Sequence, residues 1–422
     1  MSGAPPSIAD NQTRTFLRLW ATLAPALSTD RDIPERLNQL LKRNRSFGSR
    51  DRRLYRELAY TGFRYHAWLA GGLASGGEDA IRALAWLAAD IPAARQLKLR
   101  WCHDWPAPPD SLEAKRGILR IRARGLNLDA SVMPAWLADE CPEANHSPLL
   151  DTLNTRSPLW IRLQSDDLPA IRSEFYHRGW LATPSPVLDH AWRIDARDAD
   201  VTQSSAFRSG GFEIQDLGSQ IVAAAPPIRK GSRWLDACAG AGGKTLAIAR
   251  RVGTAGSVTA WDVRTSALEE LQTRAERARL RNIEVRRPGS SEAFDGVFID
   301  TPCTGSGTWR RAPHLKHSTT LATIRDAARR QLELLNTLSS HVRPGGTLVY
   351  ATCSLCRSEN SDVTTAFLSA NPEFRRLALL ESFGYPATPG SGELHIRPDV
   401  HDTDGFYLAC FVRSQDPGLS CT

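Results

Sequence analysis

The sequence predicts an α/β protein made of three successive parts. A helical region covers residues 1–142, a small α/β segment covers residues 143–220, and parallel strands alternating with helices cover residues 221–422. Three observations support this division. Apolar side chains recur every three or four residues in the first part, short strand-like runs alternate with polar loops in the second, and nearly continuous apolar runs alternate with amphipathic segments in the third.

The overall composition favours an ordinary globular protein. The chain has 422 residues, of which 41% are hydrophobic and 23% charged, so it can bury a core and is neither wholly disordered nor a coiled coil. It contains no apolar run of about 18 residues, and residues 1–11 do not resemble a secretory signal. We therefore expect a soluble, cytoplasmic protein that has no membrane partner and acts as a monomer.

The charge balance is compatible with a nucleic-acid partner. Lysine and arginine together number 53 against 46 aspartates and glutamates, which gives a formal net charge of +7. Arginine, which binds phosphate and stacks on bases, supplies most of the positive charge. The 8 cysteines lie in a chain without secretory features, so we expect thiols rather than a disulfide framework.

The helical first part contains one strongly basic segment. Apolar spacing predicts helices over residues 13–27 and 51–73. The second helix and the residue before it carry five arginines, which are Arg50, Arg52, Arg53, Arg56 and Arg64. Such a helix can follow a phosphate backbone, but the same pattern is typical of a solvated helix face, and the residues alone leave both interpretations open.

The second part reads as a small mixed sheet with little chemistry of its own. Short strands are predicted over residues 159–163, 192–194 and 212–214, with a helix over residues 168–177. The segment therefore predicts a structural module ahead of the larger sheet.

The third part predicts a parallel sheet covered by helices on both faces. The expected strands cover residues 233–239, 257–263, 283–286, 294–300 and 347–353, followed by later strands near 375–379 and 405–412. Helices are expected over residues 245–252, 266–280 and 321–342. Sheets of this kind bind their ligands at the carboxyl ends of the strands.

A glycine-rich loop follows the first of these strands. Its residues, from Cys238 to Thr245, read CAGAGGKT. Cys238 occupies the first glycine position of a Walker A motif, and Thr245 occupies the third glycine position of a dinucleotide motif, so ATP and NAD are disfavoured. Asp262 lies at the end of the next strand, about 20 residues later, where a carboxylate can bind a ribose diol, although a lone aspartate there is often a helix cap.

Two cysteines follow the fourth and fifth strands. Cys303 comes shortly after Asp300, and Cys353 ends the next strand. A single cysteine is usually a small buried apolar residue, but two thiols at neighbouring strand ends beside a carboxylate indicate a reactive site.

A metal or dithiol site is the competing interpretation of these cysteines. Cys353 and Cys356 form a C-x-x-C pair, and His314 and His317 form an H-x-x-H pair. A second C-x-x-C pair is missing, so we expect no metal, and the zinc or dithiol alternative stays open to metal analysis.

These motifs together resemble a known enzyme family. DACAGAGGKT, DTPCTGSGTWRR and ATCSLCRSEN are similar to motifs I, IV and VI of the RsmB/NOL/NOP/Sun family of RNA cytosine-5 methyltransferases. QDLGS at residues 215–219 resembles the family's lead-in to its catalytic domain, and DGFY at residues 404–407 resembles its closing strand. The basic helical region resembles the NusB-type RNA-binding domain found in ribosomal RNA methyltransferases of this family.

The resemblance implies a Rossmann-like class I methyltransferase domain that uses S-adenosyl-L-methionine on RNA, with ribosomal RNA as the expected substrate. It implies that Cys353 is the nucleophile, that Cys303 assists release, and that Asp300 and Lys244 bind the target base. The residues that it implies for the cofactor are Cys238, Ala239, Gly240, Ala241, Gly242, Gly243, Lys244, Asp262 and Asp300.

Two departures from the family pattern leave an alternative. Ala241 replaces a common proline, which keeps the glycine framework. The acidic residue expected after the third strand is missing, since the chain reads RPGS at residues 287–290. A catalytically weakened RNA-binding or ribosome-assembly factor with the same fold is therefore the alternative, and the intact Cys303 and Cys353 argue against it.

Overall fold

The computed structural model describes residues 7–165, 167–195, 200–386 and 390–415, and the chain divides into two compact units. Unit 1 comprises the chain up to Arg156 together with Thr308–Thr320, and unit 2 comprises Ser157–Gly307 and the chain from Leu321 onward. The boundary expected at residue 142 lies inside unit 1. In the described residues, no helix is both long and apolar enough to cross a membrane.

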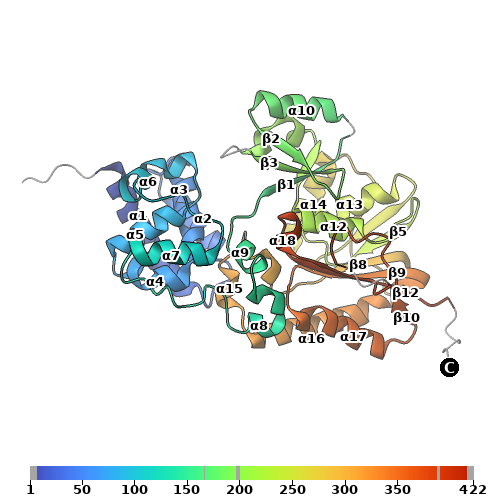
Figure 1. Ribbon diagram of the computed structural model, residues 1–422. Coiled ribbons are helices and arrows are strands. Elements are labelled where there is room, and N and C mark those ends of the chain that lie inside the picture. Colours follow the sequence, from blue (N-terminus) through green and yellow to red (C-terminus); the bar gives the residue numbers. More distant parts are fainter. Residues whose placement is uncertain (1–6, 166, 196–199, 387–389, 416–422) are drawn as a thin grey trace, which may run out of the picture. The chain divides into compact units, whose positions relative to one another are not determined.

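Helices joined by loops make up the described residues of unit 1 (Figure 1). Its core contains large aromatic side chains, among them Trp20, Phe63, Trp68 and Trp86. The helices are α1 (Ile8–Leu23), α2 (Ile33–Arg43), α3 (Ser49–Arg64), α4 (His66–Ala74), α5 (Glu78–Leu87), α6 (Arg95–Trp101), α7 (Leu112–Arg122), α8 (Leu137–Glu140), α9 (Leu149–Leu153) and α15 (Leu315–Ser318).

The single helix expected over residues 51–73 is in fact two helices. Tyr65 lies between α3 and α4 with φ −108° and ψ 27°, outside the helical region. Its buried hydroxyl donates a hydrogen bond of 3.0 Å to the carbonyl oxygen of Asn154. The apolar spacing continues through the break because both helices bury side chains in the same core, so periodicity could not reveal it.

Two of the five arginines of the basic segment are not fully exposed, since Arg52 is half-buried and Arg64 is buried. Arg64 is buried and donates a 2.7 Å hydrogen bond to the carbonyl oxygen of Arg310, while the Nζ of buried Lys316 donates to the carbonyl oxygen of Arg64. Burial lowers the pKa of Lys316 to about 7. The expectation that Arg64 lies on a phosphate-binding face is therefore wrong, whereas Arg50, Arg53 and Arg56 are exposed.

Unit 2 begins with a four-stranded antiparallel sheet in the order β2-β3-β1-β4. Its strands are β1 (Leu159–Leu163), β2 (Leu181–Pro184), β3 (Ala191–Asp195) and β4 (Phe212–Ile214), accompanied by α10 (Leu168–His177), α11 (Ser205–Arg208) and α12 (Leu217–Ala224). Strand β2 was not expected from the sequence. It is a largely exposed edge strand of four residues, too short and too exposed to show an apolar pattern.

The larger sheet of unit 2 has eight strands in the order β10-β12-β9-β8-β5-β6-β7, with β11 paired to β12. Strands β5 to β9 run parallel, whereas β12 pairs antiparallel with β9, β10 and β11. The strands are β5 (Arg233–Asp236), β6 (Ser257–Ala260), β7 (Ile283–Val285), β8 (Phe294–Asp300), β9 (Val342–Thr352), β10 (Phe374–Arg376), β11 (Glu393–Ile396) and β12 (Phe406–Arg413).

Helices cover both faces of this sheet, as the apolar strands predict. The helices are α13 (Gly243–Val252), α14 (Thr265–Arg277), α16 (Leu321–Ser339), α17 (Ser361–Ala370) and α18 (Pro398–His401). One core cluster joins Trp234 and Phe298 to side chains of α12 and α13. A second joins their strand neighbours Leu235 and Ile299 to side chains of α16 and α17. Alternate residues of β5 and β8 thus pack on opposite faces.

Strand β9 starts five residues earlier than the sequence predicts. It begins at Val342 rather than at residue 347, and the preceding helix ends at Ser339 rather than at residue 342. The sequence Pro344-Gly345-Gly346 is typical of a turn, and Gly345 has a φ of +72°. The pairing of β9 with β8 nevertheless continues past these residues, with a register shift between Phe294 and Gly296. Strand β11 was likewise not expected.

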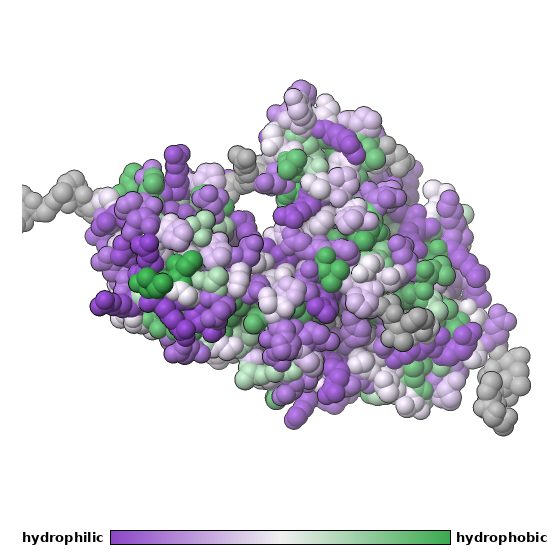
Figure 2. Space-filling view, in the orientation of Figure 1, coloured by the Kyte–Doolittle hydropathy of each residue, from purple (hydrophilic) through white to green (hydrophobic). Residues whose placement is uncertain are grey.

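The surface of the described residues is mostly polar. Figure 2 shows hydrophilic side chains over most of the visible face, with apolar residues scattered among them. Exposed large apolar side chains such as Leu99, Ile121 and Leu380 come from separate parts of the sequence.

Candidate active site

The strand order brings the polar segments singled out in the sequence to one edge of the sheet. Strands β9, β8, β5 and β6 are consecutive neighbours and run parallel, so their carboxyl ends lie at the same edge. The segments that follow them carry Cys353, Cys303, the glycine-rich loop and Asp262, respectively. This is the edge at which ligands are expected on a doubly wound sheet.

The sulfur atoms of Cys303 and Cys353 lie 3.2 Å apart, and both residues are partly exposed. Their loops are tied together, because the amide of Gly307 donates a 3.0 Å hydrogen bond to the carbonyl oxygen of Cys353. The hydrogen bond with Cys353, together with burial, raises the pKa of the Cys303 thiol well above its usual value. Cys303 therefore keeps its proton and can donate it in a hydrogen bond to the Cys353 sulfur.

The glycine-rich loop needs glycine at the turn that starts α13. Gly242 has a φ of +84°, and a Cβ there would lie 2.6 Å from the Cγ of Leu271. The preceding Gly240 has a φ of +52°, and its amide donates a 2.8 Å hydrogen bond to the Oδ2 of Asp262. The loop after β5 is thus fixed to the segment after β6.

Asp262 is already engaged by four hydrogen bonds. Besides the amide of Gly240, it accepts bonds from the backbone amide, the Nε and an Nη of Arg264, at 2.9, 3.0 and 3.1 Å. Burial of Asp262 opposes the shift, but these bonds hold its pKa below the usual value, so it is an ionised acceptor. The Arg264 side chain is 66% exposed. An incoming diol would therefore compete with an exposed guanidinium for the oxygens of Asp262.

Lys244 and Asp300 form an ion pair across the site. The Nζ of Lys244 lies 2.5 Å from the Oδ2 of Asp300 and 5.3 Å from the ring centroid of Phe406. Lys244 belongs to the first turn of α13 and Asp300 ends β8, so the pair links the glycine-rich loop to the strand that precedes Cys303.

Sequence reasoning missed the role of Asp236 at the end of β5. The side chain is 1% exposed, and its Oδ2 accepts a 2.6 Å hydrogen bond from the Thr245 hydroxyl. Its Oδ1 has no hydrogen-bond partner among the described residues. Burial raises the pKa of Asp236 to about 7. A buried acceptor without a partner beside a glycine-rich loop is the structural signal of an absent cationic or hydrogen-bonding group.

The missing acidic residue after β7 has a basic substitute. Arg287 lies with its guanidinium carbon 5.5 Å from the ring centroid of Trp261, the residue before Asp262. Arg287 is exposed, and the loop that carries it runs directly into β8. This region therefore offers an arginine and an aromatic face instead of a carboxylate.

The C-x-x-C and H-x-x-H pairs of the zinc alternative belong to different units, and within its own unit each pair has other contacts. Cys356 is fully buried, with its sulfur 3.5 Å from the Ser306 hydroxyl, and Cys353 instead approaches Cys303. His317 makes a 2.8 Å hydrogen bond to the carbonyl oxygen of Phe63 within unit 1. Across the described ranges, no group of three or more potential ligands has the arrangement of a metal site.

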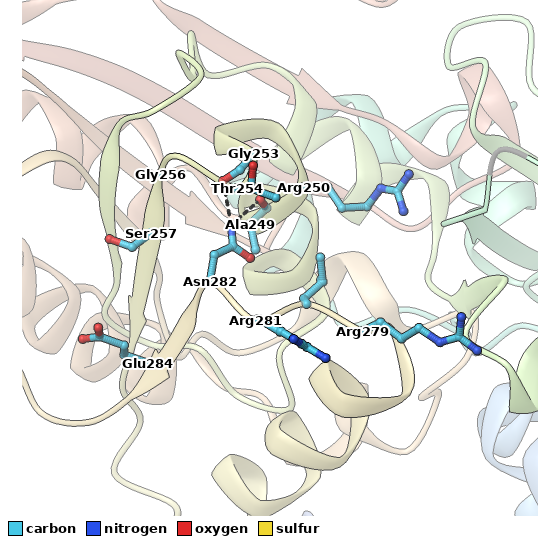
Figure 3. A pocket seen from close by; sticks show the side chains of 11 residues that line it. Ala249, Arg250, Gly253, Thr254, Gly256, Ser257, Arg279, Arg281, Asn282 and Glu284 are labelled. Carbon is cyan, nitrogen blue, oxygen red and sulfur yellow. Dashed lines mark hydrogen bonds between the residues drawn. The ribbon is translucent and has the colours of Figure 1, made fainter.

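A pocket of about 560 Å³ lies at the opposite end of the parallel strands (Figure 3). Its lining includes Ser257, the first residue of β6, and Asn282, the residue before β7. The Asn282 amide donates to the carbonyl oxygens of Ala249 and Gly253. Because these are the amino ends of the strands, this pocket is separate from the candidate active site.

Comparisons with known proteins give a consistent match for the part of the chain that forms the larger sheet of unit 2. Residues 224–412 match the model of a family described as 16S rRNA methyltransferase RsmB/F. A ribosomal RNA small subunit methyltransferase B from Klebsiella pneumoniae is 32% identical over 308 residues, which cover 67% of this chain and 66% of the relative. The chain thus aligns with slightly less than two thirds of that relative's length.

Two solved structures share the fold. The crystal structure of a protein named PH0851 superposes with a TM-score of 0.70 and 20% identity, covering 96% of this chain and 99% of that one. The structure of NSun6 from Pyrococcus horikoshii with SFG gives a TM-score of 0.58 and 18% identity, covering 67% of this chain and 97% of that one. At these identities the likeness supports the fold.

Proposed function

Because the chain belongs to the RsmB/F family of methyltransferases through residues 224–412, we propose that it is an RNA cytosine-5 methyltransferase that acts on ribosomal RNA and uses S-adenosyl-L-methionine. The observation that carries this proposal is the 3.2 Å approach of the Cys303 and Cys353 sulfurs at the carboxyl ends of two parallel strands. One thiol for attack and another beside it for release is what substitution at carbon 5 of cytosine requires.

The residues around the glycine-rich loop fit the proposed cofactor. The unpartnered Oδ1 of Asp236 is an acceptor that the ammonium group of a methionine moiety would satisfy, and ionised Asp262 is an acceptor for ribose hydroxyls. Gly240 and Gly242 let the backbone come close to the ligand. We assign cofactor binding to residues 238–244, Asp262 and Asp300. When bound, the cofactor supplies an electrophilic methyl group.

The mechanism follows from the two thiols. In our proposal, the Cys353 sulfur adds to carbon 6 of cytosine, which makes carbon 5 electron-rich enough to take the methyl group. Carbon 5 then loses its proton to solvent water, the electrons of that C–H bond re-form the ring double bond, and the carbon–sulfur electron pair returns to Cys353. Cys303 assists this release, since its sulfur lies 3.2 Å from the leaving sulfur. The Lys244–Asp300 pair orients the target base.

Unit 1 is assigned the capture of RNA in this proposal. Its exposed arginines on and before α3, including Arg50, Arg53 and Arg56, give it the positive charge that a phosphate backbone requires. We interpret unit 1 as a NusB-like RNA-binding domain, and we propose that the protein works as a monomer in the cytoplasm.

Two observations favour a second candidate, a weakened enzyme that acts as a ribosome-assembly factor. The Arg264 side chain is hydrogen-bonded to Asp262, the carboxylate that would bind ribose. Arg287 lies in the loop after β7, where the family has an acidic residue near the adenine. Both features would lower affinity for the cofactor, whereas neither alters the cysteine pair.

A methyl-transfer assay separates the two candidates. Purified protein is incubated with methyl-labelled S-adenosyl-L-methionine and small-subunit ribosomal RNA, and the digested nucleosides are identified by mass spectrometry. We expect labelled 5-methylcytidine from the parent and from Cys356→Ala, and none from Cys353→Ala. RNA binding without any labelled nucleoside from the parent would instead favour the assembly factor.

A further inference from the structure

Glu359 makes direct contact with both cysteine loops, although it lies outside the residues assigned to the reaction above. It follows Cys353 by six positions, in the short 3₁₀ helix Arg357–Glu359, and its side chain is completely buried. A buried carboxylate far from a compensating cation needs hydrogen bonds to each oxygen.

The Glu359 carboxylate accepts four hydrogen bonds. Its Oε1 accepts from the backbone amide of Thr304 at 2.9 Å and from the Nε2 of Gln331 at 3.0 Å. Its Oε2 accepts from the hydroxyl of Ser354 at 2.6 Å and from the hydroxyl of Thr304. An ionised carboxylate offers about four acceptor positions and no donor, so these four donors match it fully.

The partners of Glu359 are the residues immediately after the two reactive cysteines. Thr304 follows Cys303, and Ser354 follows Cys353. The carboxylate therefore bridges two loops that lie 50 residues apart in the sequence, at the positions that fix where each sulfur sits. The hydroxyls of Ser306 and Ser354, 3.1 Å apart, add a second link between the same loops.

The neighbouring Asn360 holds the Cys353 loop in the same way. Its Oδ1 accepts a 2.7 Å hydrogen bond from the Thr352 hydroxyl, and its Nδ2 donates a 3.0 Å bond to the carbonyl oxygen of Ser354. Cys353 is thus fixed on both sides by side chains from one turn. The Tyr350 hydroxyl donates to the carbonyl oxygen of Glu359 at 2.6 Å and anchors that turn to β9.

We propose that Glu359 is a positioning residue that holds the Cys303 and Cys353 sulfurs at reaction distance. The inference rests on the proposed function, since it explains how the two thiols of that reaction are aligned. Glu359 acts on the sulfurs through Thr304 and Ser354, the residues that its carboxylate bonds. Loosening either link lets the sulfurs separate, which slows chemistry by misplacing the reacting atoms while leaving the RNA and cofactor surfaces in place.

The test compares Glu359→Gln with a matched control. An amide in place of the carboxylate presents two N–H donors to groups that are themselves donors, so about half of the four bonds are removed. Glu393→Gln is the control, because Glu393 is also a partly buried carboxylate of unit 2, and the partners that bond it, Thr364, Tyr407 and Arg376, belong to neither cysteine loop. Thr304→Val is a milder variant that removes the hydroxyl bond to Oε2 and keeps the amide bond to Oε1.

The first readout is independent of methyl transfer. Diamide takes the two thiol hydrogens and converts Cys303 and Cys353 to one disulfide, and peptide mapping measures the rate at which that disulfide forms. We expect Glu359→Gln to slow this rate by about 10-fold and Thr304→Val by a smaller factor, with Glu393→Gln like the parent. This measurement remains informative even if the parent transfers no methyl group, in which case the proposed function fails and the positioning role is still tested.

The second readout separates positioning from general damage. We expect Glu359→Gln to lower kcat about 10-fold or more while the Kd values for RNA and S-adenosyl-L-methionine stay within about 2-fold of the parent. The Glu359→Gln/Thr304→Val double variant should lose less than the product of the single losses, because both changes remove the same link. The proposal is overturned if Glu359→Gln leaves both the rate of disulfide formation and kcat unchanged. It is also overturned if the variant weakens ligand binding, lowers kcat and lowers thermal stability to the same extent.

Discussion

Asp236 and Glu359 are both buried carboxylates of unit 2, and they differ in how many of their oxygen positions are paired. Glu359 accepts four hydrogen bonds, whereas Asp236 accepts one, from the Thr245 hydroxyl, and leaves Oδ1 without a partner in the described chain. Burial accordingly raises the pKa of Asp236 to about 7. An incompletely paired carboxylate at the carboxyl end of β5 is the pattern expected of a ligand-binding group.

The raised pKa of Asp236 predicts a pH dependence of stability. Between about pH 4 and pH 7 the folded protein holds a proton on Asp236 that the unfolded chain has lost, so the free energy of unfolding falls as pH rises through this window. In Asp236→Asn this contribution is absent. We expect denaturation of the ligand-free protein to show that, from pH 5 to pH 8, the free energy of unfolding of the parent falls by roughly 3 kcal/mol more than that of the variant.

Asp295 supplies a control of opposite sign. Burial opposes the shift, but hydrogen bonds from the amide of Arg233 and the side chain of Arg343 lower its pKa, so its contribution to stability is present at neutral pH and lost as pH falls. Asp295→Asn should therefore destabilise the protein most at neutral pH. Identical pH profiles for the parent and Asp236→Asn would contradict the charge assignment at Asp236.

At the scale of elements, the basic face of α3 is the feature of unit 1 with a functional interpretation. Arg50 donates to the carbonyl oxygen of Pro92 and Arg56 to the Asn38 side chain, yet both remain exposed, as does Arg53. Arg64 at the end of the same helix is buried and takes no part. The face available to RNA is therefore the first half of the helix.

The salt dependence of RNA binding tests this face. Replacing Arg50, Arg53 and Arg56 with glutamine should flatten the slope of log affinity against log salt by about one unit for each phosphate that is no longer neutralised. The control replaces Arg120, Arg122 and Arg124, which are exposed residues at the end of α7, two of them paired with acids. Equal slopes in filter binding for the α3 variant and the parent would make α3 an ordinary solvated helix.

At the scale of the whole molecule, the parallel sheet and its helical cover were predictable because continuous apolar strands occur only where both faces are buried. The four segments of the candidate site were predictable for the same reason, since parallel strands end at a common edge. Local pattern did not show that residues 308–320 belong with unit 1, because this grouping depends on contacts with residues far away in sequence.

The hydrogen bonds and ion pairs that position the site residues could not be predicted from the sequence. Nothing in the spacing of Glu359 shows that its oxygens bond the residues after both cysteines, since that depends on the register between loops that follow β8 and β9. Arg264 offered no signal either, because an arginine two residues after Asp262 reads as an ordinary surface side chain. The ion pair between them appears only in three dimensions.

The most direct test of the central claim is the covalent adduct formed during the reaction. Each variant is incubated with ribosomal RNA and methyl-labelled S-adenosyl-L-methionine and then separated by denaturing electrophoresis. Cys303→Ala retains the attacking sulfur but lacks the group that assists release, so it should accumulate a labelled protein–RNA band, while Cys353→Ala should form none. A band from Cys353→Ala in place of Cys303→Ala would reverse the two roles, and absence of any band together with an inactive Cys356→Ala would contradict the cysteine-pair mechanism.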